Sequence, residues 1–149
     1  MKKRILLISS GGGHWLQLLR LLPAIKNEKL YFATVNASYQ VNVGSSPFFL
    51  ITDANRWTRL KMFQTIIDTL RIVLKVKPHF VISTGAAPGM WGIIFGKLFG
   101  SKTIWLDSIA NINTLSLSGK LVRGFSDLYL TQWQKVAHHS EAEYRGSVL

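Results

Sequence analysis

The fold of this chain is decided near its N-terminus by residues 4–20, RILLISSGGGHWLQLLR. Residues 4–8 are strand-like, with an apolar run over residues 5–8, and residues 15–20 have the apolar spacing of a helix. Two serines, three glycines and His14 separate them. Glycines let a chain turn sharply and let backbone N–H groups approach a phosphate. The segment therefore favours an α/β protein with an anion-binding turn, although a tight turn capped by a polar side chain has the same pattern.

The glycine segment matches neither G-x-G-x-x-G nor the Walker pattern, which argues against a dinucleotide or ATP. His14 would stand where the anion sits. Because imidazole titrates near neutral pH, His14 could move a proton there. The alternative is a hydrogen-bonded residue that only begins the helix.

Apolar strand patterns alternate with helical patterns along the rest of the chain, as in a doubly wound, mostly parallel sheet. The sequence predicts one Rossmann-like α/β domain over residues 1–149, with an exposed loop over residues 35–46. The expected strands are Ile5–Ser9, Leu30–Val35, Phe48–Ile51, Phe80–Thr84, Thr103–Leu106 and Leu128–Thr131, and the expected helices are Trp15–Ile25, Arg56–Lys75, Met90–Phe99 and Leu117–Phe125.

In such sheets, ligands bind beyond the carboxyl ends of the strands. Three polar loops are expected there, over residues 9–14, 83–89 and 107–119. Each could be turn chemistry alone, but three at one edge favour a cleft suited to phosphate. The candidate ligand-binding residues are Ser10, Gly11, Gly12, Gly13, Thr84, Gly85, Ser108, Asn111, Ser118 and Lys120.

The chain is strongly basic, with 18 Lys and Arg against 7 Asp and Glu and a formal net charge of +11. Such a surface attracts nucleic acid, acidic lipid or phosphorylated substrates. No nucleic-acid-binding motif accompanies the charge, so nucleic acid is disfavoured. The basic, apolar segment 56–77 could lie in a membrane interface, or it could be a packing helix with a basic outer face. The candidate membrane residues are Arg56, Trp57, Arg59, Lys61 and Phe63.

Other patterns exclude whole classes of chemistry. The chain has no cysteine, so thiol catalysis and disulfides are absent, and a reducing cytoplasm is favoured. The longest uncharged stretch, residues 80–96, is shorter than the roughly 20 residues that cross a bilayer. His138 and His139 precede two glutamates, but adjacent histidines rarely converge on one metal ion. We therefore expect no metal and no cofactor.

The loops together, in their order and spacing, are similar to the membrane-associated subunit of split glycosyltransferases. In eukaryotes that subunit pairs with a smaller catalytic partner to add N-acetylglucosamine to dolichol-diphosphate-linked N-acetylglucosamine, and bacterial relatives serve capsule and exopolysaccharide assembly. The resemblance spans nearly the whole chain. Its motifs are residues 9–14, 83–86, 107–108 and 115–121, followed by residues 127–133 and 144–149.

The resemblance implies the N-terminal, acceptor-binding half of a two-domain GT-B glycosyltransferase, inactive without a catalytic partner that holds the nucleotide-sugar. Gly11–Gly13 would cradle a lipid diphosphate, with Lys120 neutralising part of its charge. His14 would be the catalytic base. Asp107 would be a base or would orient His14, although a turn-capping carboxylate is the alternative. Residues 133–149 would dock the partner.

Two departures from the family stand out. Eukaryotic members carry an N-terminal transmembrane helix that this sequence lacks, so surface contacts would hold it peripherally on the cytoplasmic face of the membrane. Many relatives have glutamate where this chain has Asp107. Two rival functions remain open at this point: a non-catalytic scaffold that stimulates the partner, and a free-standing nucleotide-binding Rossmann domain.

Overall fold

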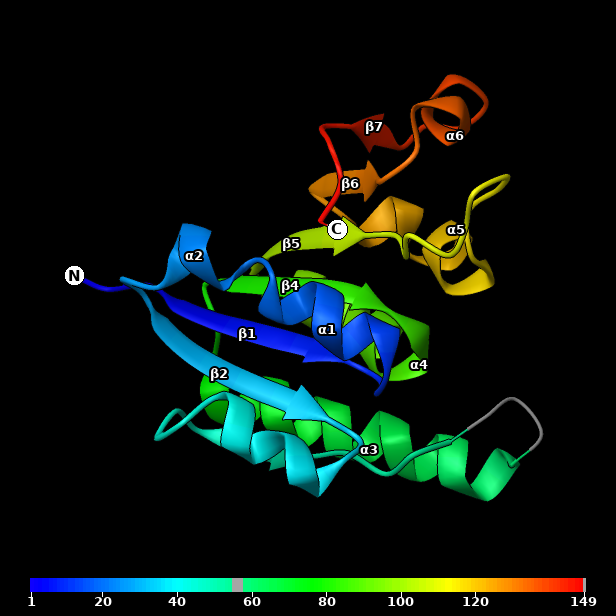
Figure 1. The fold of residues 1–149 in the computed structure, drawn as a ribbon. Helices are drawn as coiled ribbons and strands as arrows, with labels where there is room; N and C mark the ends of the chain where they lie inside the picture. The colour runs from blue at the N-terminus through cyan, green and yellow to red at the C-terminus, as the bar shows by residue number, and fades with distance from the viewer. Residues whose placement is uncertain (55–57, 149) are drawn as a thin grey trace.

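The computed structural model describes residues 1–54 and 58–148. Within them, seven parallel strands form one sheet in the order β3-β2-β1-β4-β5-β6-β7 (Figure 1). This doubly wound arrangement confirms the predicted fold class. The strands are β1 Arg4–Ser9, β2 Lys29–Thr34, β3 Phe48–Leu50, β4 Phe80–Gly85, β5 Lys102–Leu106, β6 Leu128–Thr131 and β7 Glu143–Tyr144.

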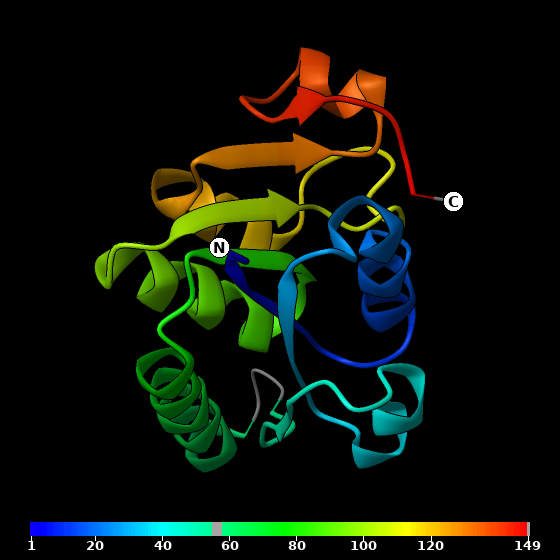
Figure 2. The same cartoon turned by 90° about the vertical axis from the view of Figure 1, so that its left-hand side faces the viewer.

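Helices cover both faces of the sheet (Figure 2). Alternate β1 side chains explain the two layers, because successive residues of a strand point to opposite faces. Leu6 and Ile8 pack with α3 and α4, whereas Ile5 and Leu7 pack with α1. The helices are α1 Gly13–Leu19, α2 Leu22–Ile25, α3 Arg59–Val76, α4 Ala86–Leu98, α5 Leu117–Val122 and α6 Gln134–His138, with 3-10 turns η1 Ala37–Asn42 and η2 Arg123–Phe125.

Four predicted segments differ from the structure. The helix expected over 15–25 divides into α1 and α2, because Pro23 favours the first turn of a new helix. The loop expected over 83–89 is the end of β4 followed at once by α4. The loop expected over 35–46 contains η1. The C-terminal segment, for which no helix or strand was predicted, forms α6 and β7 and buries Val136 and Ala142.

The basic segment forms the long helix α3, but its apolar positions do not all face the core. The buried line of α3 consists of Thr65, Thr69, Ile72, Val73 and Val76. The threonine hydroxyls are satisfied by helix carbonyls, with Thr69 Oγ1 donating to the carbonyl of Thr65 at 2.8 Å. The apolar side chains at the start of α3 therefore remain outside: Leu60 is 88% exposed and Phe63 is 64% exposed.

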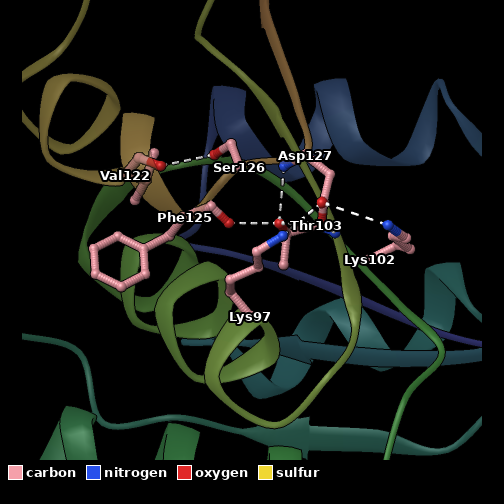
Figure 3. Close-up of polar contacts among 7 residues, drawn as sticks. All are labelled: Lys97, Lys102, Thr103, Val122, Phe125, Ser126 and Asp127. Carbon is pink, nitrogen blue, oxygen red and sulfur yellow. Dashed lines mark hydrogen bonds and ion pairs between the residues drawn. The ribbon is translucent and has the colours of Figure 1, made fainter.

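At the amino ends of the strands, Asp127 joins the start of β6 to β5 and α4 (Figure 3). Its carboxylate lies 2.5 Å from Lys97 Nζ and accepts a hydrogen bond of 2.9 Å from the Thr103 N–H. The hydrogen bond from Lys97, followed by those from Thr103, lowers the pKa of Asp127 to about 2, against the opposing effect of burial.

We therefore predict that Asp127→Asn destabilises the fold in a pH-dependent way. A carboxylate whose pKa is lowered by folding stabilises the native state above its ordinary pKa, and that stabilisation is lost as the pH falls through its folded pKa. The cost should be about 1–2 kcal/mol at pH 6, after allowance for partial exposure, and should shrink as the pH falls from about 4 to about 2. Urea unfolding at several pH values measures it. Lys102→Gln, which removes a cation 3.7 Å from the same carboxylate, is the control and should have a small effect. A pH-independent cost for Asp127→Asn would contradict the account.

Candidate functional site

The site lies where the order of the sheet reverses direction. After β1 the chain crosses to β2 on one side, whereas β4 lies beside β1 on the other side. The segments that follow β1 and β4 therefore lead away from each other at the carboxyl ends of the strands, the usual place of a ligand site in doubly wound sheets. The structure confirms that all three predicted segments begin at this edge, because β1, β4 and β5 are parallel neighbours.

Two hydrogen bonds join His14 to Thr84 at this point of the sheet. Thr84 Oγ1 donates to the carbonyl of His14 at 2.6 Å, and His14 Nδ1 lies 2.9 Å from the carbonyl oxygen of Thr84. A carbonyl oxygen can only accept, so the second bond requires the proton on Nδ1. In the neutral imidazole, Nε2 then carries the lone pair. The backbone of β4 thus presets His14 as a proton acceptor at Nε2.

Gly85 keeps the space that the imidazole needs. A Cβ built on Gly85 would lie 2.5 Å from both Cε1 and Nδ1 of His14. Gly85 also has φ +141°, a conformation that L side chains rarely adopt. Any side chain at residue 85 would therefore strain the backbone and displace the ring. Thr84 and Gly85 thus lie against His14 and do not form a separate loop.

The loop after β1, residues 10–13, is called the glycine loop below. It is open toward solvent and is held in place by a hydrogen bond to Tyr39. Gly12 has φ +65°, and a Cβ built there would meet nothing within 4 Å. Its N–H donates to Tyr39 Oη at 3.0 Å. The ring of Tyr39 stacks on Trp15, with the ring centroids 5.3 Å apart. Trp15 is 1% exposed, so it is a core residue.

A cleft of about 680 Å³ opens on the β2–β3 side of the glycine loop. Its wall is formed by the loop after β1, the segment that follows β2 and the residues around the end of β3. The lining residues are Ser10, Gly11, Val35, Asn36, Ala37, Tyr39, Leu50 and Asp53. The imidazole of His14 bonds to β4, on the other side of the loop. The loop therefore separates a proton-accepting group from a polar cleft.

Asp107 does not contact His14 and instead organises the loop after β5. Its carboxylate is 1% exposed and accepts hydrogen bonds from Trp105 Nε1, Asn111 Nδ2 and both the N–H and the hydroxyl of Ser116. Gly119 must lack a side chain here, because a Cβ would lie 2.6 Å from Asp107 Oδ1. The contact to His14 Nδ1 that sequence reasoning considered for Asp107 is made by Thr84.

Two buried glutamines connect the loops. Gln17, on α1, accepts the Ile109 N–H at 3.1 Å and the Gln132 side-chain amide at 2.5 Å. Gln132 also donates to the carbonyl of Asp107 and accepts the N–H of Val148. Sequence reasoning missed Gln17 and Gln132. The available signal for Gln132 was its position directly after β6, at the same edge as the other site segments.

The remaining predicted residues divide into inward and outward positions. Ser108 is buried, and its hydroxyl accepts weakly from Gln17 and Ala110, while Asn111 faces Asp107. Ser118 and Lys120 lie on α5, where Lys120 is exposed. Arg59, Lys61 and Phe63 are exposed at the start of α3. The membrane candidates Arg56 and Trp57 lie outside the described residues.

Residues 1–54 and 58–148 contain no group of three His, Asp or Glu side chains placed to hold a metal ion. None of the helices in this part of the chain is both long and apolar enough to cross a bilayer.

Solved structures confirm the fold. MurG of Acinetobacter baumannii superposes with a TM-score of 0.76 at 10% identity, over 100% of this chain and 46% of that one. The Staphylococcus aureus MnaA–UDP structure superposes with a TM-score of 0.73 at 14% identity, over 99% and 44%. The chain thus spans less than half of each and has the Rossmann-like fold of one half of a GT-B protein.

Sequence relatives cover most of the chain. The UDP-N-acetylglucosamine transferase subunit ALG14 of Yarrowia lipolytica is 25% identical over 96% of this chain and 80% of that protein. The human subunit of the same name is 24% identical over 97% and 82%. Residues 50–148 match the family described as "Oligosaccharide biosynthesis protein Alg14 like". The chain therefore belongs to the Alg14-like family of oligosaccharide biosynthesis proteins.

Proposed function

We propose that this chain is the acceptor-binding subunit of a two-component glycosyltransferase in polysaccharide biosynthesis, with a polyprenyl-diphosphate-linked saccharide as its acceptor. The catalytic partner would hold the nucleotide-sugar, as expected for a chain with the fold of one GT-B half. The observation that carries the proposal is the pair of bonds between His14 and Thr84, which leaves Nε2 as the proton acceptor beside an open glycine loop.

His14 is proposed to act as the general base. Sugar transfer requires removal of the proton from the acceptor hydroxyl as its oxygen attacks the anomeric carbon and the nucleotide leaves. Nε2 of His14 takes that proton, and the carbonyl of Thr84 then continues to accept from Nδ1–H in the imidazolium. Holding the ring in one orientation before the reaction lowers the entropic cost of reaching the transition state.

The acceptor diphosphate is proposed to lie against Gly11, Gly12 and Gly13. Gly12 and Gly13 are exposed, and the space beside Gly12 is open. The first N–H groups of α1 lack acceptors within the helix and can donate to phosphate oxygens. Lys120 is proposed to supply a mobile positive charge from α5. Asp107 does not contact the acceptor in this scheme. Its hydrogen bonds to Asn111 and Ser116 position the loop that carries Ser108 and Asn111.

The start of α3 is proposed to contact the membrane. Leu60 and Phe63 are exposed beside Arg59 and Lys61. This end of α3 lies at the same edge of the sheet as the carboxyl ends of the strands (Figure 1). Exposed apolar side chains flanked by cations suit the surface of an anionic bilayer. A peripheral position on the cytoplasmic face would thus bring the acceptor site toward its lipid-linked substrate.

The C-terminal segment 133–149 is proposed to dock the catalytic partner. Its strand β7 forms an exposed edge of the sheet in the described part of the chain. Its end returns to the site, because the Val148 N–H donates to buried Gln132 and the Val148 carbonyl accepts from Arg20. A partner seated on this segment would complete the active site opposite His14.

The function is tested by turnover of the chain purified with a co-expressed nucleotide-sugar-binding subunit, on a lipid-linked saccharide. The complex should transfer sugar and the single chain should not. His14→Ala and His14→Gln should each lower kcat roughly 100-fold or more, the scale for losing a general base, while lipid binding changes little. Glutamine keeps a hydrogen bond but cannot take the proton, so both variants should behave alike.

Glycine variants separate positioning from loss of folding. Gly85→Ala should lower kcat because its Cβ displaces the His14 ring. Gly124→Ala is the matched control, since a Cβ on Gly124 meets nothing within 4 Å, and it should keep wild-type turnover. Circular dichroism checks that each variant is folded. Near-normal kcat in both His14 variants would reject the base and leave a scaffold that only stimulates its partner.

The membrane assignment predicts a salt-dependent attachment to anionic vesicles. Arg59→Gln with Lys61→Gln should weaken binding about tenfold or more, since each cation near the surface contributes about 1 kcal/mol, and Phe63→Ala should weaken it further. Vesicle co-sedimentation at low and high salt measures this. Lys2→Gln with Lys26→Gln removes equal charge at the amino ends of the strands and should have a smaller effect. If the two double variants lost vesicle binding to the same extent, the net charge of the chain alone would account for its attraction to the membrane.

A further inference from the structure

We propose that the cleft between the glycine loop and β3 is a saccharide subsite, with Asp53 as its hydrogen-bond acceptor. It would bind a neutral sugar of the acceptor that does not itself react. This inference rests on the proposed function, because Ser10 and Gly11 belong both to the cleft and to the loop assigned to the diphosphate. It adds a site on the β2–β3 side of the loop, away from the imidazole.

Asp53 stands apart from every other acidic side chain. All seven lie within the described residues, and Asp53 alone makes no hydrogen bond or ion pair there. The other six accept hydrogen bonds or pair with cations: Glu28, Asp68, Asp107, Asp127, Glu141 and Glu143. In a chain of net charge +11, a carboxylate without a partner at the wall of a cleft is an acceptor available for a ligand.

The negative charge of Asp53 determines which part of the acceptor can bind in the cleft. A carboxylate repels phosphate, so the diphosphate belongs to the glycine loop and not to the Asp53 end of the cleft. Sugar hydroxyls and acetamido N–H groups are neutral donors, and hydrogen bonds to a charged acceptor are stronger than those between neutral groups. The cleft is therefore suited to the part of the acceptor that carries hydroxyls and no charge.

The rest of the wall is built for the same chemistry. Asn36 Oδ1 is occupied by the N–H and hydroxyl of Ser38, which fixes the amide and leaves its NH2 donors without a partner in the described part of the chain. Tyr39 is fixed by stacking on Trp15 and by the N–H of Gly12, so its hydroxyl proton remains for a ligand. Leu50, 56% exposed, offers an apolar surface to the face of a sugar ring.

The test uses the full chain labelled with 15N and titrated with soluble N,N′-diacetylchitobiose. Amide shifts of Ser10, Asn36 and Tyr39 should change in the wild type. Asp53→Asn should raise the dissociation constant for the disaccharide about tenfold, the scale for losing a hydrogen bond to a charged group. Glu28→Gln removes an equal charge at the amino end of β2 and should titrate like the wild type. Shifts that avoid the cleft, or an unchanged affinity in Asp53→Asn, would overturn the subsite.

A second arm separates this inference from the proposed function. In detergent micelles, the wild type should bind polyprenyl diphosphate carrying N,N′-diacetylchitobiose more tightly than the same lipid without sugar, and Asp53→Asn should remove that difference. Equal binding of both lipids by the wild type would overturn the subsite while supporting the anion loop. Failure to bind either lipid, with the disaccharide shifts still mapping to the cleft and lost in Asp53→Asn, would reject the anion loop and support the subsite.

Discussion

The reciprocal hydrogen bonds between His14 and Thr84 hold together the candidate site at the carboxyl ends of the strands. They join the loop after β1 to the end of β4 across the point where the sheet reverses its order. A buried backbone carbonyl cannot donate, so this contact sets the tautomer of the imidazole as well as its orientation. Gly85 is required by the same contact, because a Cβ there would occupy the space of the ring.

The distribution of charge follows from what each acidic group contacts. Asp127 and Asp107 are held by donors on the protein, and each fixes a junction between elements. The excess of Lys and Arg is spread over exposed positions and includes the start of α3, where it accompanies exposed Leu60 and Phe63. A basic surface of this kind favours acidic lipid and phosphate, while the Asp53 cleft is set aside for neutral groups in our proposal.

Much of the fold could be predicted from the sequence, because residues 5–8 and 80–82 are apolar runs of the kind that a parallel sheet buries on both faces. Helix ends were less predictable. Residues 86–89 were expected to be a loop because they contain Pro88 and Gly89, yet they form the first turn of α4. Gly89 and Gly92 let that helix approach β4 and β1 closely, a tertiary effect that local patterns do not carry. His14 was singled out from its place after the glycines, but Gln17 and its partners Ile109 and Gln132 lie too far apart in sequence for spacing to pair them.

The orientation of His14 can be measured directly by 15N NMR of its imidazole in the full chain. The 15N chemical shift of each ring nitrogen, read through its long-range coupling to the carbon-bound ring protons, distinguishes a protonated nitrogen from a bare one. The account predicts that, in the neutral ring, Nδ1 carries the proton and Nε2 is bare, and that Gly85→Ala abolishes this preference by displacing the ring. A neutral ring protonated at Nε2 in the wild type would contradict the hydrogen bond to Thr84 and with it the assignment of His14 as the base.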